Sequence, residues 1–400
     1  MKYWRQFIEV YVREFKLVFS DQGILLFLLF LPLGYPVIYS LIYNPELVRE
    51  VRMVVVDHDR SQKSRELVRN LDACQEINVI GYAADMGEGK EAMHSHECFG
   101  ILEIPEGFGR KIGRGEQAPA VIYSDMSLLL RYRGFLVAST NVMTEMGAEM
   151  LDENLNRVVP MGGSLMPGDI MPINNVSMGN ISNGFDSFVM PGIVVLILQQ
   201  SIILAIGMAG GAKRERRRLT GYNAVNMEPS VLMTMLGQAG CYMTLMILPS
   251  IWLLHYIPLI FSFPMAGNML EIFCFILPMV LASIMLGFCI QGFVTERENI
   301  FIIWVVTSVI FLFLSGLTWP QYAIHGFWRF LSDMVPATWG VQGFIKMNAN
   351  GSSLAQVAPE YIHLWILAGV YYLLGYLTQR FVQRPVILKA ASNLNHDLSK

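Results

Sequence analysis

Apolar residues fall into one block near the start of the chain and five blocks in its second half, with a long, mostly polar stretch between them. A helix needs ~20 apolar residues to cross the ~30 Å hydrocarbon core of a bilayer. Six segments meet that need: 23–43, 188–210, 231–254, 270–293, 300–319 and 362–379. A soluble protein with buried helices would not leave six nearly uncharged stretches of this length. We therefore predict an α-helical polytopic membrane protein with six transmembrane helices.

Composition and charge agree with this prediction and orient it. Hydrophobic residues make up 54% of the 400 residues and charged residues 15%. Fourteen Lys and Arg lie in the N-terminal arm, in 211–230, between the fourth and fifth spans and in the tail, against two in the other short connections. Basic connections resist translocation, so we expect both termini and the basic segment 211–230 to face the cytoplasm.

Three parts follow from this layout. Residues 1–43 form an interfacial helix, with apolar and aromatic groups at helical spacing over 3–19, and a first span that is retained rather than cleaved. Residues 44–185 form an extracytoplasmic domain with 13 basic and 20 acidic residues, which offers no nucleic-acid-binding patch. Residues 186–400 form a five-helix transmembrane domain.

The inserted segment reads as a mixed α/β domain. Strand patterns cover 51–57, 76–82, 99–104 and 120–123, and helical patterns cover 61–71, 86–94 and 128–157. Pro105 to Phe108 read as a turn followed by a helix. Alternation of strands and helices predicts a mixed sheet, and we expect its helices on one face.

Two clusters in this domain contain residue types that bind metals. They are His94, His96 and Cys98, and the run Asp57-His58-Asp59, but neither spacing matches a zinc pattern. Asp57 and Asp59 before Ser61 are more simply a strand end with a helix N-cap, so we assign no metal site. Cys74 and Cys98 are the two cysteines of the domain, and an oxidising compartment could pair them in a disulfide or leave them free.

Motifs for nucleotide binding and hydrolysis are missing from the chain. It has no G-x-x-x-x-G-K-[ST], no G-x-S-x-G and no H-E-x-x-H, which leaves it without a P-loop or a recognisable catalytic site. Charges inside the predicted spans are scarce, and ion-coupled carriers usually need them. If the protein moves a molecule, we expect the energy to come from another subunit.

One tract near the outer end of the fifth span is specific. It runs Ser315-Gly316-Leu317-Thr318-Trp319-Pro320, and Pro336-Ala337-Thr338 follows. Serine, glycine and proline in this order end a helix, and the next residues are too apolar for a solvated loop. The tract resembles the Ser-Gly/Pro turn and Pro-x-Thr motif of permeases in the type-2 ABC exporter superfamily. In that family a re-entrant outer hairpin follows the turn, here 320–350.

A second tract lies after the second span, where the family has a cytoplasmic loop. Glu215, Thr220 and Pro229 match its acidic residue, threonine and proline, while Leu219 and Gly221 depart from its pattern. The resemblance implies that 211–230 is a coupling loop whose short helix docks on an ATP-binding subunit. The residues we expect to carry coupling are Glu215, Arg216, Arg217, Thr220 and Pro229.

The resemblance, which covers essentially the whole chain, also implies the partners. It implies an ABC ATP-binding subunit that holds ATP and Mg, so this chain needs no cofactor of its own. It implies a second permease, as a homodimer or a heterodimer with a paralogue, and a periplasmic membrane-fusion adaptor on the outer domain. The expected location is the bacterial inner membrane. The many methionines in or beside the spans suit a hydrophobic substrate and equally suit ordinary packing.

Two other classes of function remain open from the sequence. A membrane-anchored sensor or binding protein would use the outer domain as a receptor, but it has no need of a re-entrant hairpin. An intramembrane enzyme would need paired carboxylates or a His/Ser set in the spans. We therefore favour the permease of an ATP-driven exporter.

Overall fold

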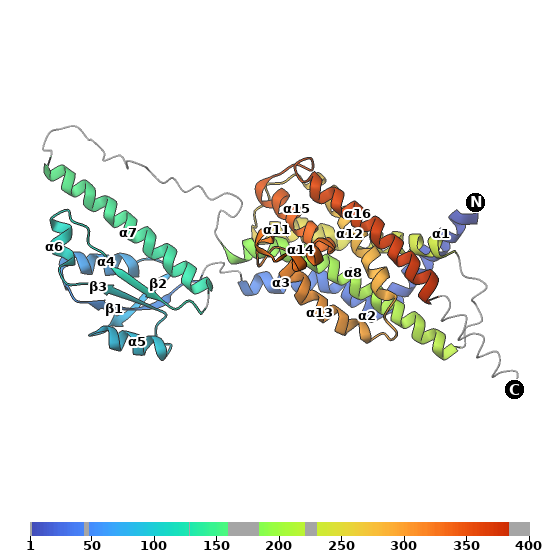
Figure 1. The fold of residues 1–400 in the computed structure, drawn as a ribbon, viewed down its shortest axis with the longest axis horizontal. Helices are drawn as coiled ribbons and strands as arrows, with labels where there is room; N and C mark the ends of the chain where they lie inside the picture. Colours follow the sequence, from blue (N-terminus) through green and yellow to red (C-terminus); the bar gives the residue numbers. More distant parts are fainter. Residues whose placement is uncertain (1, 44–47, 128, 159–183, 221–229, 384–400) are drawn as a thin grey trace. The chain divides into compact units, whose positions relative to one another are not determined.

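The computed structural model describes residues 2–43, 48–127, 129–158, 184–220 and 230–383, and Figure 1 shows the course of the chain. It divides into two compact units. The first joins Met1–Asn44 to Ser177–Lys400, and the second is Pro45–Val176. The second unit lies inside the predicted 44–185 segment.

The first unit is a bundle of helices. An amphipathic helix, α1 (Lys2–Ser20), precedes a continuous helix made of α2 (Gln22–Leu25), a π-helical turn (Leu26–Phe30) and α3 (Leu31–Tyr43). The remaining helices are α8 (Phe185–Thr220), α9 (Val231–Leu245), α10 (Ile247–Ile251), a π-helical turn (Trp252–Tyr256), α11 (Ile257–Phe261), α12 (Met269–Gln291), α13 (Asn299–Leu314), a 3-10 turn (Gln321–Ala323), α14 (Gly326–Asp333), α15 (Pro336–Asn350), α16 (Ala358–Leu377) and a π-helical end (Thr378–Gln383).

Five of these helices are long and apolar enough to cross a membrane, within the part of the chain that the structure describes. They are Gln22–Tyr43, Phe185–Glu215, Val231–Phe261, Met269–Gln291 and Ala358–Phe381. The predicted fifth span is shorter than expected. Helix α13 ends at Leu314 because Gly316 has a φ of +83°, and its 16 residues extend only about 24 Å.

Helix α8 lies at the centre of the bundle. Its segment from Val194 to Ala209 is buried almost throughout, and it packs against α3, α12, α13 and α15. A helix that is apolar all round must be covered on every side by protein or by lipid, and here other helices cover α8. Apart from Asp186 in its first turn, the charged residues of α8 gather after this segment, at its C-terminal end.

The second unit contains one four-stranded sheet. Strands β1 (Val51–Asp57), β2 (Ile77–Tyr82), β3 (Gly100–Ile104) and β4 (Val121–Ser124) lie in the order β2-β1-β3-β4. Strand β1 is parallel to β2 and β3, and β4 is antiparallel to β3. Its helices are α4 (Gln62–Asp72), α5 (Met86–His94), α6 (Phe108–Gly113) and α7 (Leu129–Val158). The predicted strands and helices are confirmed to within one or two residues at each end.

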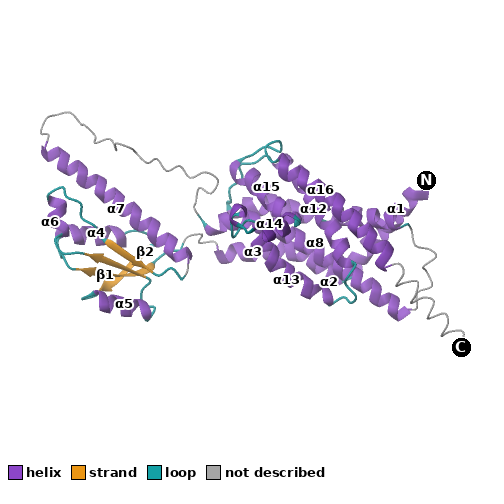
Figure 2. Cartoon of the chain, viewed as in Figure 1, coloured by secondary structure: helices purple, strands orange, loops and turns teal. Residues whose placement is uncertain are grey.

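The expectation that the helices cover one face of the sheet is wrong. Figure 2 shows α4 and α7 on one face and α5 on the other, and the apolar side chains form two separate clusters. The crossover from β1 to β2 and the crossover from β2 back to β3 run in opposite directions across the sheet. Since such crossovers are right-handed, their helices must lie on opposite faces.

This arrangement separates the two cysteines of the domain. Cys98 is buried in the cluster beneath α5, whereas Cys74 packs against the cluster on the other face. Both are free thiols. A disulfide between them would have to pass through the sheet, so the pairing considered from the sequence is not made.

Asp57 at the end of β1 and Asp59 after it accept backbone hydrogen bonds, as predicted, but the N-cap of α4 is Ser61 and not a carboxylate. Asp57 accepts hydrogen bonds from the backbone N–H of Asp59 and Arg60 at 3.0 and 2.8 Å, and Ser61 caps α4 through the N–H of Ser64. Asp59 accepts from the N–H of Gly107 and Gly109, both at 2.8 Å. A hydrogen bond from Ser61, together with these backbone donors, lowers the pKa of Asp59.

Candidate functional site

The basic end of α8 is where the bundle concentrates its charged contacts. Just before it, Gly210 and Gly211 allow the segment between α12 and α13 to come close. A Cβ on Gly211 would lie 2.7 Å from the backbone N of Arg297, which is closer than real contacts allow. Gly211 thus permits the contact that brings Arg297 beside α8, and Gly210 makes room for the side chain of Gln291 at the end of α12.

Arg214 ties α8 to the end of α12. Its guanidinium donates to the carbonyl of Gln291 at 2.8 Å, to that of Gly292 at 3.1 Å, and to that of Val294. The last carbonyls of a helix have no partner within it, and they carry the negative end of its dipole. Arg214 therefore caps α12 with both hydrogen bonds and charge.

Lys213 ties α8 to the N-terminal helix. Its ammonium donates to both carboxylate oxygens of Glu14, at 2.8 and 2.6 Å. Gln238 and Tyr242 of α9 also donate to that carboxylate, both at 3.1 Å. The side chain of Glu14 is 1% exposed and that of Lys213 is 22% exposed, so this is a largely buried ion pair that joins three helices.

Burial by itself raises the pKa of the Glu14 carboxyl. The positive charge of Lys213 and the hydrogen bonds from Lys213, Gln238 and Tyr242 outweigh that effect and hold the pKa below its ordinary value. Glu14 is thus a buried carboxylate that stays charged because of its partners.

Close packing of α1 on α9 places Glu14 there. A Cβ on Gly237 would lie 2.8 Å from the Cβ of Val10 and 3.0 Å from the carbonyl oxygen of Phe7. Val10 and Val18 are both fully buried, and Glu14 lies between them at the same four-residue spacing. The carboxylate therefore falls on the buried stripe of α1.

A second ion pair joins the start of the first span to the turn before α13. Arg297 contacts Asp21 at 2.5 Å. Asp21 also caps α2, since it accepts from the N–H of Gly23 and Ile24 at 3.0 and 3.2 Å. We use the name charged joint for Glu14, Asp21, Lys213, Arg214 and Arg297.

The coupling residues predicted from the sequence begin at Glu215, directly after Lys213 and Arg214 of the charged joint. The side chain of Glu215 is exposed. Arg216, Arg217 and Thr220 belong to the last turns of α8, with side chains outside the described set, and Pro229 lies outside the described residues. The segment predicted as a loop from 211 is helical as far as Thr220, because α8 continues past the apolar segment without a break.

Sequence reasoning missed Glu14, Asp21 and the roles of Lys213, Arg214 and Arg297. One signal could have found Glu14: it is a carboxylate at the four-residue spacing of Val10 and Val18, on an apolar stripe where an unpaired charge is costly. Nothing in the sequence names its partner, which is 199 positions away.

At the far end of α13 the structure brings the predicted hairpin residues together. The carbonyl of Leu314 accepts a hydrogen bond from Ser332 at 2.7 Å and one from Thr338 at 3.5 Å. Ser315 folds back on Leu312, with 2.7 Å between its hydroxyl and that carbonyl. The Ser-Gly turn and the Pro-x-Thr segment thus meet at the last carbonyls of one helix.

A glutamine of α8 anchors the other helix of the hairpin. The amide oxygen of Gln199 accepts from the backbone N–H of Ala337 at 2.7 Å, directly after Pro336, which begins α15. Gln199 is fully buried. We use the name hairpin joint for Gln199, Leu314, Ser332, Ala337 and Thr338.

The two helices of the hairpin differ in burial. In α15, Gly340 packs against Met279 and Val195, and Gly343 packs against Phe275. In and before α14, aromatic side chains lie exposed: Trp319, Tyr322, Phe327, Trp328 and Phe330. Pro320 directly precedes the 3-10 turn (Gln321–Ala323) that lies between the end of α13 and α14. Helix α15 is thus part of the bundle, while α14 presents aromatic groups outward.

Comparison with known proteins places the chain in a family. The sequence profile of the ABC-2 family transporter proteins matches residues 23–377. This match includes both joints apart from Glu14 and Asp21, and it also includes the whole second unit. No curated protein gives a match.

Proposed function

The chain belongs to the ABC-2 family of transporter proteins, and from that premise we propose that it is the permease of an ATP-driven exporter. Membership makes it a multi-pass transmembrane subunit of an ABC transporter and implies an ABC ATP-binding partner. The proposed reaction moves a hydrophobic or amphipathic molecule out of the cytoplasm or the inner leaflet. The chain itself supplies the path and no catalytic group.

The charged joint is the observation that carries this proposal. It connects the basic end of α8 to α1, to α9 and to the turn between α12 and α13 through ion pairs and hydrogen bonds. A partner that moved this end of α8 would displace all of these elements together. This is the arrangement that a subunit without its own energy source needs.

The charged joint also supports an orientation of the bundle in the membrane. Lys213, Arg214 and Arg297 lie at one end of the bundle, where the N-terminal helix also packs. We propose that this end faces the cytoplasm of a bacterial cell, at its inner membrane. Helix α13 would be the fifth of six spans, completed by the residues up to Trp319, and α14 and α15 would form the outer re-entrant hairpin.

We propose a second permease beside this one, of the same or a paralogous sequence, and an adaptor on the outer domain. Support comes from the surface of α13, where Ile302, Val305, Val306, Val309 and Phe313 are exposed. Lipid or a second permease must cover such an apolar face.

Gln200 supports an amphipathic substrate. It is 5% exposed, and neither polar atom of its amide has a hydrogen-bond partner among the described residues. It lies two turns before Gly207, which packs against Ile300 of α13, so it faces the seam between α8 and α13. An unsatisfied buried amide is costly, and a hydrogen-bonding group on the substrate would satisfy it.

Replacing this glutamine tests the choice of substrate. Gln200→Leu should reduce export of hydrogen-bonding amphiphiles up to about tenfold, the effect of losing one net hydrogen bond, and leave export of purely apolar molecules unchanged. Export assays in vesicles with both kinds of molecule measure this. An equal change for both kinds would contradict the role given to Gln200.

The first experiment concerns Glu215, because it is the exposed acidic residue next to the charged joint. The tagged protein is purified in detergent with its ATP-binding subunit, and substrate-stimulated ATP hydrolysis and export are measured. Glu215→Lys should abolish both while the protein stays in the membrane. The matched control is Glu149→Lys, an exposed acidic residue of the second unit, which should leave both unchanged.

Two results would contradict the proposal. A Glu215→Lys variant that stimulates ATP hydrolysis and exports normally would remove Glu215 from coupling. Recovery of the chain without any ATP-binding subunit, even after cross-linking in the membrane, would favour the sensor function instead.

A further inference from the structure

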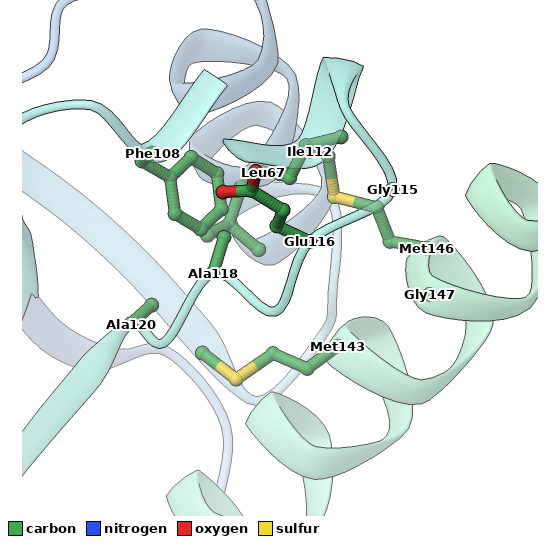
Figure 3. Close-up of a pocket in the computed structure, with 10 residues that line it drawn as sticks. All are labelled: Leu67, Phe108, Ile112, Gly115, Glu116, Ala118, Ala120, Met143, Met146 and Gly147. Carbon is green, nitrogen blue, oxygen red and sulfur yellow. The ribbon is translucent and has the colours of Figure 1, made fainter. Parts of the chain in front are cut away.

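The second unit contains a cavity of about 420 Å³ beside its sheet. It lies between α4, α6, the segment after α6 and the middle of α7, as the close-up in Figure 3 shows. Its walls are mainly apolar, with Leu67, Phe108, Ile112, Met143 and Met146 among them. Sites for small molecules usually have volumes of about 300 to 1,000 Å³ and walls of this kind.

A glycine in α7 keeps one wall of the cavity open. Gly147 lines the cavity, and a Cβ built on it would find no atom within 4 Å. Glycine in the interior of a helix costs about 1 kcal/mol relative to alanine, and close packing often explains it. Here no neighbour requires a glycine, so a larger side chain at this position would have room beside the cavity.

Two methionines on the same wall, which α7 forms, suit a ligand of variable shape. Met143 and Met146 lie one turn apart on α7, and Figure 3 shows both sulfur-bearing side chains directed at the cavity. Met146 is buried, whereas Met143 is partly exposed. Unbranched, polarizable thioethers adapt to irregular apolar surfaces.

One carboxylate lies at the wall of the otherwise apolar cavity. Of the described residues that line it, Glu116 alone is charged. Gly115, with a φ of +72°, turns the chain there, and the backbone N–H of Glu116 donates to the carbonyl of Lys111 at 2.9 Å. Its carboxylate lies 3.9 Å from Arg114, and both side chains are more than half exposed. Such an ion pair contributes little, so a ligand cation can replace Arg114.

We propose that this cavity binds a small, mostly apolar molecule that carries one protonated amine. The hydrocarbon part fills the space between Phe108, Met143 and Gly147, and the ammonium group pairs with Glu116. A carboxylate at the edge of an apolar cavity attracts a cation and repels an anion. This inference does not depend on the transport proposal, because binding needs neither ATP nor a partner subunit.

Photolabelling of the full-length protein in lipid nanodiscs tests the site. The probe is octylamine bearing a diazirine, and the labelled residues are identified by mass spectrometry. We expect labels in the segment 108–120 and on Met143 and Met146, removed by excess octylamine and not by octanoate. Because the carboxylate is more than half exposed, Glu116→Gln should lower labelling by the amine only about threefold and leave labelling by the corresponding octanol probe unchanged.

Two further variants separate the cavity from general apolar surface. Gly147→Phe fills the space and should remove the labels, whereas Ala148→Phe adds the same ring one position along α7 and should not. If Gly147→Phe does not fold, Gly147→Leu makes the same test with a smaller side chain. The proposal is overturned if labels fall only in the spans, if octanoate competes as well as octylamine, or if both ring variants behave alike.

Discussion

The charged joint and the hairpin joint hold the same central helix by different chemistry. In the charged joint, one ion pair and a guanidinium on helix carbonyls fasten the basic end of α8, and a second ion pair joins the start of the first span to the turn before α13. In the hairpin joint, hydroxyl, amide and backbone groups without charge fasten α13 and α15 to each other and to α8. Ion pairs act over a distance and can exchange partners, whereas neutral hydrogen bonds require close geometry. The comparison indicates a joint that another charged surface can rearrange and a joint that keeps its shape.

The largest expected effect comes from removing one charge of the buried pair. Lys213→Met leaves the Glu14 carboxylate buried without a counter-charge, and we expect the free energy of unfolding to fall by about 3 kcal/mol. Denaturant titration of the purified protein measures this. The double variant Glu14→Gln, Lys213→Met removes both charges and should recover most of the loss; a double variant as unstable as the single one would contradict a charged joint.

A smaller loss is expected from the hairpin joint. Gln199→Leu leaves the backbone N–H of Ala337 buried without a partner, which costs about 1–3 kcal/mol. Gln200→Leu is the matched control, since the adjacent amide has no hydrogen bond to lose among the described residues, and it should not destabilise the protein. The same denaturant titration compares the two, and equal losses would show that the bond to Ala337 contributes nothing.

The smallest effect concerns pH and separates the two joints directly. Because the pKa of Glu14 is held below its ordinary value of 4.5, its contribution to stability is fully present above that value and is lost as the pH falls through the lowered pKa. Stability of the unmodified protein should therefore fall below about pH 4.5 more than that of Glu14→Gln. Gln199→Leu should keep the full acid response of the unmodified protein. An identical acid response in Glu14→Gln and the unmodified protein would contradict the assignment.

Patterns along the chain were enough to predict most helices and strands. They did not predict which of these elements pack against each other. The strands and helices of the second unit follow from local periodicity. The position of α5 on the opposite face follows from the handedness of the crossovers together with the strand order, and the strand order is not visible locally. The end of α13 at Leu314 follows from Gly316, whose positive φ stops the helix before the apolar run ends.

The two joints show that the sequence also predicts individual site residues better than it predicts their partners. Ser315, Gly316, Pro336 and Thr338 could be recognised as a motif, and Ser315 and Thr338 both bond to carbonyls at the end of α13. The partner of Thr338 is a backbone carbonyl, which no side-chain pattern reveals. Gln199 reaches Ala337 only because of the register in which α8 packs against α15. Lys213 and Glu14 meet because Gly237 lets α1 approach α9, and no local pattern contains that information.

The length of α8 has one more consequence. Its 36 residues form a rod of about 54 Å, with Gly192 near one end packed on Leu317 and Lys213 near the other. A rotation of about 5° around the middle of such a rod moves each end by about 2.4 Å, in opposite directions. A force that tilts α8 at one face of the membrane without breaking the helix would thus move its other end, at the opposite face, by about the length of a hydrogen bond.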